Sequence, residues 1–229
     1  MTTVTIDENA PAIMRRNALA VLPAPIVVGA ILIGLRGAPD LLPLLLGAAG
    51  WMVALMLRQP VALVASKTTS RERAATIVGW FSGPAEELTR LVLVLVVIRS
   101  FDQAIWAGFG WATIEVLLVM VNGLAIAGLL TKDDPKSLEA RELLAAQGML
   151  GTQHLLWGLL ERLSATALHL GFTLMLFAQP WLVLVTLPLH SVTNMLMARY
   201  AKKNLALAEL GLAVIGAIVC VVGLQLGSA

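Results

Sequence analysis

Apolar residues run along this chain in long stretches that are separated by short polar segments. A helix needs about 20 apolar residues to cross roughly 30 Å of hydrocarbon. Seven stretches reach that length, and each predicts a membrane-spanning helix. They are 17–36, 41–65, 75–98, 104–130, 146–178, 180–198 and 206–226. In the fifth stretch, the part from Leu138 to about Leu155 is predicted to lie along the interface or to extend the helix into the cytoplasm.

The composition excludes several classes of protein. Of 229 residues, 59% are hydrophobic and 13% charged, and the mean hydropathy is +0.86. Soluble domains carry about 25% charged residues, so a soluble enzyme, a disordered tail and a disulfide scaffold are all excluded. The one cysteine, Cys220, cannot form an internal disulfide. We predict an all-α, polytopic membrane bundle of about seven helices that forms one domain over residues 1–229.

Basic residues predict the orientation, because cytoplasmic loops are enriched in lysine and arginine. With the N-terminus inside, the cytoplasmic side receives Arg15, Arg16, Lys67, Arg71, Arg73, Lys132, Lys136, Arg141, Arg199, Lys202 and Lys203. The outer side receives only Arg36 and Arg99. This asymmetry predicts an N-terminus inside and a C-terminus outside. It also accounts for the pI near 9.0 without a nucleic-acid partner, which we do not predict.

Polar residues within the predicted spans gather at one depth of the membrane. They are Glu86, Glu87 and Arg90 in the third span, Glu115 in the fourth, Glu161, Arg162 and His169 in the fifth, and His190 and Asn194 in the sixth. A charge at mid-membrane costs at least about 2.5–3.5 kcal/mol, so its presence there needs a reason. We therefore predict a polar four-helix core over 75–200, with 1–74 and 201–229 as peripheral helices.

Helical spacing predicts pairs within this core. Glu86 and Arg90 are four residues apart and can pair, and so can His190 and Asn194. A buried ion pair that fixes the helix register is the alternative interpretation of Glu86, Glu87 and Arg90. Arg58 lies near a span end, from which its side chain can reach the interface. The tryptophans lie mostly toward span ends and are interpreted as an interfacial belt, namely Trp51, Trp80, Trp106, Trp157 and Trp181.

Glutamate and histidine at one site suit hydrolysis. A carboxylate can act as the general base toward a water molecule while an imidazole supports it as an acid. The same side chains can bind zinc, for which Glu115, His169 and His190 are the candidate ligands. Either arrangement could hydrolyse a peptide bond within the membrane. No serine nucleophile motif accompanies the cluster.

Four short motifs resemble those of the PrsW/YhfC intramembrane proteases. These proteases belong to the wider superfamily (CPBP) that includes the CAAX prenyl endopeptidases. The motifs are GPAEELTR, the Trp111–Glu115 pair, the Glu-Arg of Glu161–Arg162 followed by His169, and the His190–Asn194 pair. They occur in the family's order over residues 75–200.

The resemblance implies roles for these residues. Glu86 or Glu87 would be the base that activates water, and Glu115 with His169 would complete the water or metal site. His190 would polarise the scissile carbonyl, and Asn194 would support His190 or the oxyanion. Arg90, Glu161 and Arg162 would be supporting residues. Trp111 stands where a YhfC-like protein often has histidine, which favours a glutamate-water site over a metal site.

The expectation is therefore an intramembrane peptidase of the glutamic or the metallo type, with zinc as the possible cofactor. Its partners would be a membrane protein or peptide substrate and the lipid bilayer, and the family implies a bacterial cytoplasmic membrane. Two other functions stay open. One is a proton- or cation-coupled transporter that uses the same residues as a relay, although we find no internal repeat of the kind carriers often show. The other is a non-catalytic membrane scaffold.

Overall fold

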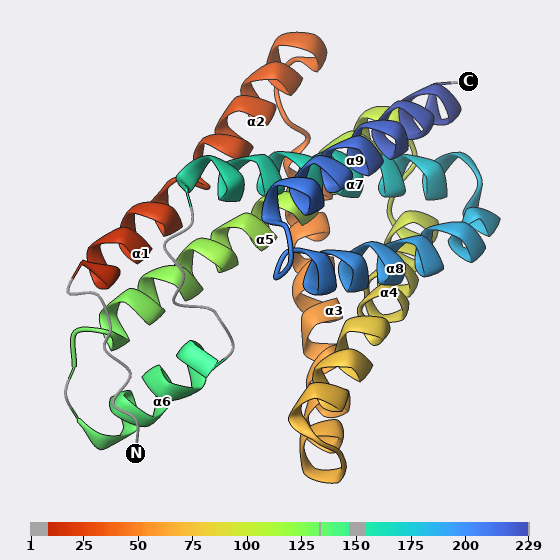
Figure 1. Ribbon diagram of the computed structural model, residues 1–229. Coiled ribbons are helices and arrows are strands. Elements are labelled where there is room, and N and C mark those ends of the chain that lie inside the picture. Colours follow the sequence, from red (N-terminus) through yellow and green to blue (C-terminus); the bar gives the residue numbers. More distant parts are fainter. Residues whose placement is uncertain (1–8, 133, 147–153, 229) are drawn as a thin grey trace.

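The computed structural model describes residues 9–132, 134–146 and 154–228, and every regular element within these ranges is a helix (Figure 1). The helices are α1 (Ala10–Leu19), α2 (Pro23–Arg36), α3 (Leu41–Thr68), α4 (Arg71–Val96), α5 (Phe101–Leu129), α6 (Pro135–Ala146), α7 (Leu155–Ala178), the short 3-10 turn η1 (Pro180–Leu182), α8 (Val183–Tyr200) and α9 (Leu205–Gly227).

Five segments of the described chain are long and apolar enough to cross a bilayer, which makes this a multi-pass membrane protein. They are Ala10–Arg36, Leu41–Thr68, Phe101–Leu129, Pro180–Tyr200 and Leu205–Gly227. The third and fifth predicted spans correspond to α4 and α7, which have 26 and 24 residues. Both are long enough to span, but they carry the buried charged side chains of the core, so apolar character alone does not identify them.

Two predicted helices have different limits in the structure. The first is divided, because α1 ends at Leu19 and α2 begins at Pro23, whose ring nitrogen has no hydrogen to donate to a preceding turn. In the fifth, α6 is a separate helix and α7 begins at Leu155. The remaining part of that predicted stretch, 147–153, lies outside the described residues.

A charged side chain outside the membrane-spanning segments caps α6. The Ser137 backbone N–H donates to Asp134 Oδ1 at 3.1 Å, and the Ser137 hydroxyl donates to Oδ2 at 2.6 Å. This is the pattern of a helix N-cap, in which a side-chain oxygen accepts from a first-turn amide. These hydrogen bonds, the hydroxyl's above all, lower the pKa of Asp134 below its ordinary value.

We expect this cap to fail in acid. A lowered pKa in the folded state means that the cap contributes stability above the unfolded-state pKa of about 3.9. That contribution is lost as the pH falls through the lower folded-state value. Hydrogen exchange at the Ser137 amide should therefore lose its protection below that pH in the wild type, and at every pH in Asp134→Ala. Protection that persists in the variant would contradict the assignment.

Helices α3 and α5 cross at small residues. A Cβ atom added at Gly47 would lie 2.0 Å from the Ala107 carbonyl oxygen, and one added at Gly110 would lie 1.9 Å from the Leu44 carbonyl oxygen. The two backbones are therefore in direct contact, an approach that glycine permits in membrane helices. The crossing places α3 against the helix that carries Glu115.

Helix α7 has its most extensive packing against α9. Gly216 of α9 lies against the backbone of Ser164, and Gly223 lies about two turns further along, against the backbone of Gly171. Because the residue numbers of α7 and α9 increase together from the first contact to the second, the two helices run in the same direction. Helix α9 thus packs along α7 (Figure 1).

The Gly83–Pro84 step of α4 joins α4 to α8 without breaking the helix. Pro84 has no N–H for the Trp80 carbonyl, which instead accepts from the Ser191 hydroxyl of α8 at 2.8 Å. A Cβ atom at Gly83 would lie 2.2 Å from the Ser191 hydroxyl oxygen, so the glycine permits this approach. The contact fixes the residue before Ser191 beside α4, and that residue is His190.

Candidate active site

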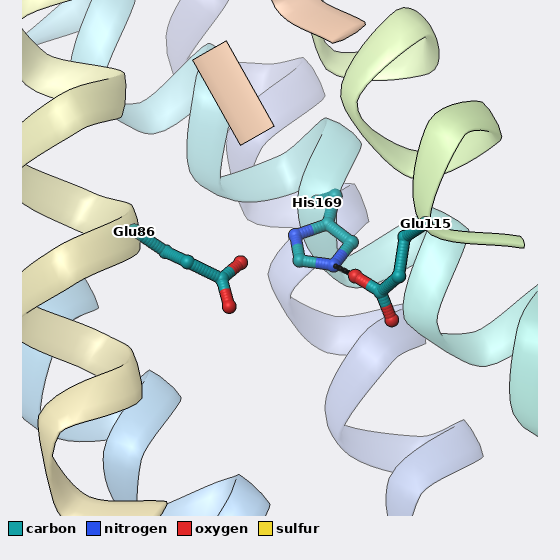
Figure 2. A group of neighbouring side chains, drawn as sticks. All are labelled: Glu86, Glu115 and His169. Atoms are coloured by element: carbon teal, nitrogen blue, oxygen red, sulfur yellow. Dashed lines mark hydrogen bonds and ion pairs between the residues drawn. The ribbon is translucent and has the colours of Figure 1, made fainter. Parts of the chain in front are cut away.

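The structure brings together five of the six residues that were predicted to be catalytic. They come from α4, α5, α7 and α8, and they are Glu86, Glu87, Glu115, His169 and His190. All but Glu115 are almost completely buried, with 0–3% of each residue exposed. In Figure 2 the Glu86 carboxylate reaches from α4 toward the ring of His169, and Glu115 approaches that ring from α5. The polar layer predicted from four consecutive spans thus exists as one cluster.

His190 is held by Glu87. Its Nδ1 lies 2.8 Å from Glu87 Oε1, which also accepts from Arg90 Nε at 3.2 Å. Glu87 paired with an arginine is a carboxylate and can only accept, so His190 Nδ1 carries a hydrogen and donates it. The ring stacks on Phe172, with 5.6 Å between the centroids. These contacts aim the other ring nitrogen, Nε2, toward Glu86.

Arg90 occupies the centre of the cluster and has no exposed surface. Besides Glu87, it donates through Nη1 to the Thr173 hydroxyl at 2.8 Å and to the His169 carbonyl at 3.1 Å. The guanidinium also lies over the ring of Trp111, 4.2 Å from the centroid. Arg90 therefore ties α4 to both α5 and α7.

The tautomer of His169 follows from its neighbours. Arg90 Nη2 lies 2.9 Å from His169 Nδ1, and a guanidinium can only donate, so Nδ1 accepts. The ring hydrogen is then on Nε2, which donates to Glu115 Oε2 at 2.8 Å, the dashed contact in Figure 2. His169 is thus a neutral imidazole with both nitrogens engaged. It connects Arg90 to Glu115 and has no free lone pair.

Glu115 links the cluster to the start of α7. Its Oε1 accepts from Arg162 Nη1 at 2.8 Å, and Arg162 also pairs with Glu161. The exposed fraction of the side chain rises along this series, from 9% for Arg162 to 20% for Glu115 and 38% for Glu161. The two supporting residues predicted on α7 therefore form the outer edge of the cluster.

Glu86 has three partners, and none of them is the predicted Arg90. Arg58 Nη1 of α3 donates to Oε1 at 3.0 Å, and Trp111 Nε1 donates to Oε2 at 3.3 Å. His190 Nε2 lies 3.7 Å from Oε1. The predicted pair of Glu86 with Arg90 is wrong, because Arg90 turns to Glu87. Spacings of three and four residues both bring side chains together on a helix, and the contacts of Arg90 with α7 select the former.

Helix α3 belongs to the cluster, although we predicted it to be peripheral. Arg58 does not extend to the interface, because its guanidinium forms an ion pair with Glu86. Trp51 is only 5% exposed and donates to Glu115 Oε2 at 3.1 Å. Its assignment to an interfacial belt was wrong, and so was that of Trp106, which is 2% exposed. The contacts of Arg58 and Trp51 with the cluster depend on the crossing of α3 with α5 and are seen only in the structure.

Asn194, the sixth predicted residue, lies outside the cluster. Its Nδ2 donates to the Ser82 hydroxyl at 2.9 Å rather than to the ring of His190. It lines a groove of about 750 Å³ between α4 and α8, together with Gly79, Trp80 and Met195. Ser82 lies one helical turn before Glu86, and Asn194 lies one helical turn after His190. Through Asn194, the groove comes within about one helical turn of His190.

The donor atoms do not fit a metal ion in this arrangement. Ligand atoms of Glu86, Glu115 and His169 lie within 4.8 Å of one another, whereas the predicted set contained His190 instead of Glu86. Each of the three contacts its own arginine: Arg58 for Glu86, Arg162 for Glu115 and Arg90 for His169. A divalent cation there would face three guanidinium groups. It would also need a histidine lone pair that Arg90 already occupies.

Sequence analysis missed one buried acid on α9. Glu209 is 2% exposed, and among the described residues its Oε2 has no hydrogen-bond partner. It interacts electrostatically with Glu161 and Arg162 at the outer edge of the cluster. Its position one turn inside an otherwise apolar span was the available signal.

Comparison with known proteins adds no relative. No family model, no curated protein and no solved structure matches the chain.

Proposed function

We propose that this protein is an intramembrane peptidase that hydrolyses a peptide bond of a membrane-associated protein with a water molecule activated by Glu86. The observation that carries the proposal is the arrangement of Glu87, His190 and Glu86, in which one carboxylate orients an imidazole toward a second carboxylate. The resemblance of the four sequence motifs to the PrsW/YhfC proteases supports the same conclusion. The donor set favours the glutamic type over the metallo type.

The distance between Glu86 and His190 suits a shared water. At 3.7 Å, Oε1 and Nε2 are beyond a direct hydrogen bond, and a water molecule beside them can contact both. Arg58 forms an ion pair with Glu86, and a carboxylate is the form of glutamate that acts as a general base. His190 Nε2 is presented to the same place because Glu87 fixes the other side of the ring.

The reaction uses these two groups as follows. The water oxygen adds to the scissile carbonyl carbon while a water proton passes to Glu86, and the carbonyl electron pair moves onto its oxygen. In this step His190 acts as an imidazolium between the two glutamates, so that Nε2 also carries a hydrogen and donates it to that anion. When the pair returns, the carbon–nitrogen bond breaks and the nitrogen takes the proton from Glu86. The products are a carboxylic acid and an amine, and no metal takes part.

A peptide can reach this place along the groove between α4 and α8. The groove is lined by both apolar and polar side chains, among them Trp80, Met195 and Arg199. An extended peptide offers the same mixture of apolar side chains and polar backbone. Asn194 lines the groove one helical turn from His190 and has an amide oxygen that can accept from a peptide N–H.

The geometry disfavours the transport alternative. A continuous series of contacts does connect Glu115, His169, Arg90, Glu87 and His190. A proton relay would have to pass through Arg90, which does not give up a proton in proteins. This series of contacts therefore holds the side chains in position, and it cannot conduct protons. A scaffold without activity would have no use for the orientation of His190.

Seven membrane spans, with the N-terminus in the cytoplasm, are the topology that we propose for this site. The distribution of basic residues supports it, and so does the length of α4 and α7. Under this topology the groove opens on the cytoplasmic side, since the start of α4 and the end of α8 lie there. The resemblance to PrsW/YhfC proteases suggests a bacterial cytoplasmic membrane.

The test uses the full chain in lipid vesicles with quenched-fluorescent peptides that each carry an apolar segment, in water enriched in heavy oxygen. We expect one heavy oxygen atom in the new carboxylate of each cleaved peptide, detected by mass spectrometry. Glu86→Gln should lower the cleavage rate at least about a hundredfold, because the base is lost. A metal chelator should leave the rate unchanged.

Glu139→Gln is the matched control, since Glu139 is an exposed acid on α6. It should cleave at the wild-type rate. Full activity of Glu86→Gln would overturn the assignment of the base. Activity that a chelator abolishes and zinc restores would overturn the metal-free mechanism.

A further inference from the structure

Arg58 is the outward neighbour of the proposed base. Its side chain is 23% exposed, compared with 4% for Glu86 and 3% for His190. The third contact of Glu86 comes from Trp111, which is completely buried. Of the three side chains in contact with Glu86, Arg58 is therefore the most accessible from outside the cluster.

The same guanidinium has donors to spare. Only Nη1 is engaged with Glu86, and among the described residues Arg58 Nε has no hydrogen-bond partner. An arginine carries five N–H donors and keeps its charge at any physiological pH. The other arginines of the cluster are each held by at least two partners, as Arg90 is by Glu87 and Thr173. Arg58 can thus donate to a further acceptor atom without losing Glu86.

Its position suits the oxygen of a carbonyl under attack. Arg58 Nη1 and His190 Nε2 approach the same atom, Glu86 Oε1, at 3.0 and 3.7 Å. A carbonyl carbon attacked by a water on that atom places its oxygen within reach of both groups. Donors aimed at the developing negative charge commonly supply a large part of the rate of acyl transfer.

We propose that Arg58 is a catalytic residue that binds the scissile carbonyl oxygen and stabilises the anion formed when water adds to the carbonyl carbon. The inference rests on the proposed function. Arg58 gains and loses no proton in the reaction. The water proton goes to Glu86 and then to the leaving nitrogen, while the guanidinium only holds the charge that appears on the oxygen and disappears when the carbon–nitrogen bond breaks.

Arg58→Gln tests the role in two ways. First, cleavage of the best quenched-fluorescent peptide should fall about 100- to 1,000-fold in kcat, with KM nearly unchanged, as for the loss of an oxyanion donor. Second, binding is measured for an apolar tripeptide phosphinate, which carries a negative tetrahedral centre, and for the matching uncharged ketone. The variant should lose affinity for the phosphinate by a factor similar to its loss in kcat, and hardly any for the ketone. Arg58→Lys should recover part of both.

A residue that merely positions Glu86 would behave differently. Its loss would lower kcat but leave the ratio of phosphinate to ketone affinity as in the wild type, and that result would overturn the proposal. Arg36→Gln is the matched control, because Arg36 is a partly exposed arginine that pairs with Asp102 at 3.5 Å away from the cluster. It should match the wild type in both measurements.

A second variant guards against misfolding of a chain with an unpaired Glu86. Arg58→Gln combined with Glu86→Gln replaces the ion pair by two neutral amides, and its phosphinate affinity is compared with that of Glu86→Gln alone. We expect a further loss in the double variant, and equal affinities would overturn the role of Arg58. A wild-type protein that neither cleaves the peptides nor binds the phosphinate would overturn the proposed function itself, whereas normal wild-type behaviour with no effect at Arg58 would remove only this inference.

Discussion

Replacing Arg90 by methionine should lower the free energy of unfolding by about 3–5 kcal/mol, the cost of removing one partner from a buried ion pair. The guanidinium is fully buried and donates to Glu87, Thr173 and the backbone of His169. Methionine fills similar space but leaves those acceptors unpaired. The loss is measured by titrating the protein in mixed micelles with a denaturing detergent and following tryptophan fluorescence.

Arg99→Met is the control for this prediction. Arg99 lies just beyond the end of the same helix, is exposed, and donates to carbonyls of the last turn. Its replacement should cost less than about 1 kcal/mol. The double variant Arg90→Met with Glu87→Met should recover part of the loss, because it removes both members of the pair. A single Arg90 variant as stable as Arg99→Met would contradict the central position of Arg90.

Gly110→Ala should destabilise the protein by about 1–3 kcal/mol, the usual cost of overpacking an interior contact. The new methyl group would lie 1.9 Å from the Leu44 carbonyl oxygen, so α3 and α5 have to move apart. A side chain could relieve such a contact by changing its rotamer, but a backbone carbonyl oxygen cannot. Because Arg58 and Trp51 reach the cluster from α3, the same change should also lower peptide cleavage.

Gly128→Ala provides the comparison on the same helix, since a Cβ atom there meets no other atom within 4 Å. Alanine is favoured over glycine in a helix by about 0.8–1.0 kcal/mol, so this variant should be as stable as the wild type or slightly more stable. The same unfolding titration serves both. Equal stability of the two variants would show that the α3–α5 crossing tolerates separation.

Most of the long helices of this protein could be predicted from the sequence because they are apolar runs with few interruptions. Every predicted span overlaps an observed helix, and Pro23 explains the one division that the apolar run concealed. The meeting of Glu86, Glu115, His169 and His190 in one cluster was also predictable, since each lies near the middle of its own run. Length and hydropathy suffice for these features.

The partners within the site could not be predicted, because they depend on how the helices are rotated against one another. Glycine contacts such as Gly110 with Leu44 and Gly83 with Ser191 set that rotation, and nothing in a single sequence pairs them. The choice of Glu87 over Glu86 by Arg90 needs the position of Thr173 on α7. The contact of Arg58 with Glu86 could not be predicted either, because it depends on the path of α3 across α4 and α5.

The charges buried on α4 and α7 also constrain how the protein is made. Under the seven-span topology, each of these helices carries side chains that resist entry into lipid on their own. Arg90 and Glu86 acquire their partners from α7 and α3, and Glu115 acquires Arg162 only after α7 has been synthesised. Insertion of α4 is therefore completed by a helix that leaves the ribosome about 60 residues later. Until then the nascent chain depends on the translocation machinery, or on temporary contacts, to hold an unfinished core.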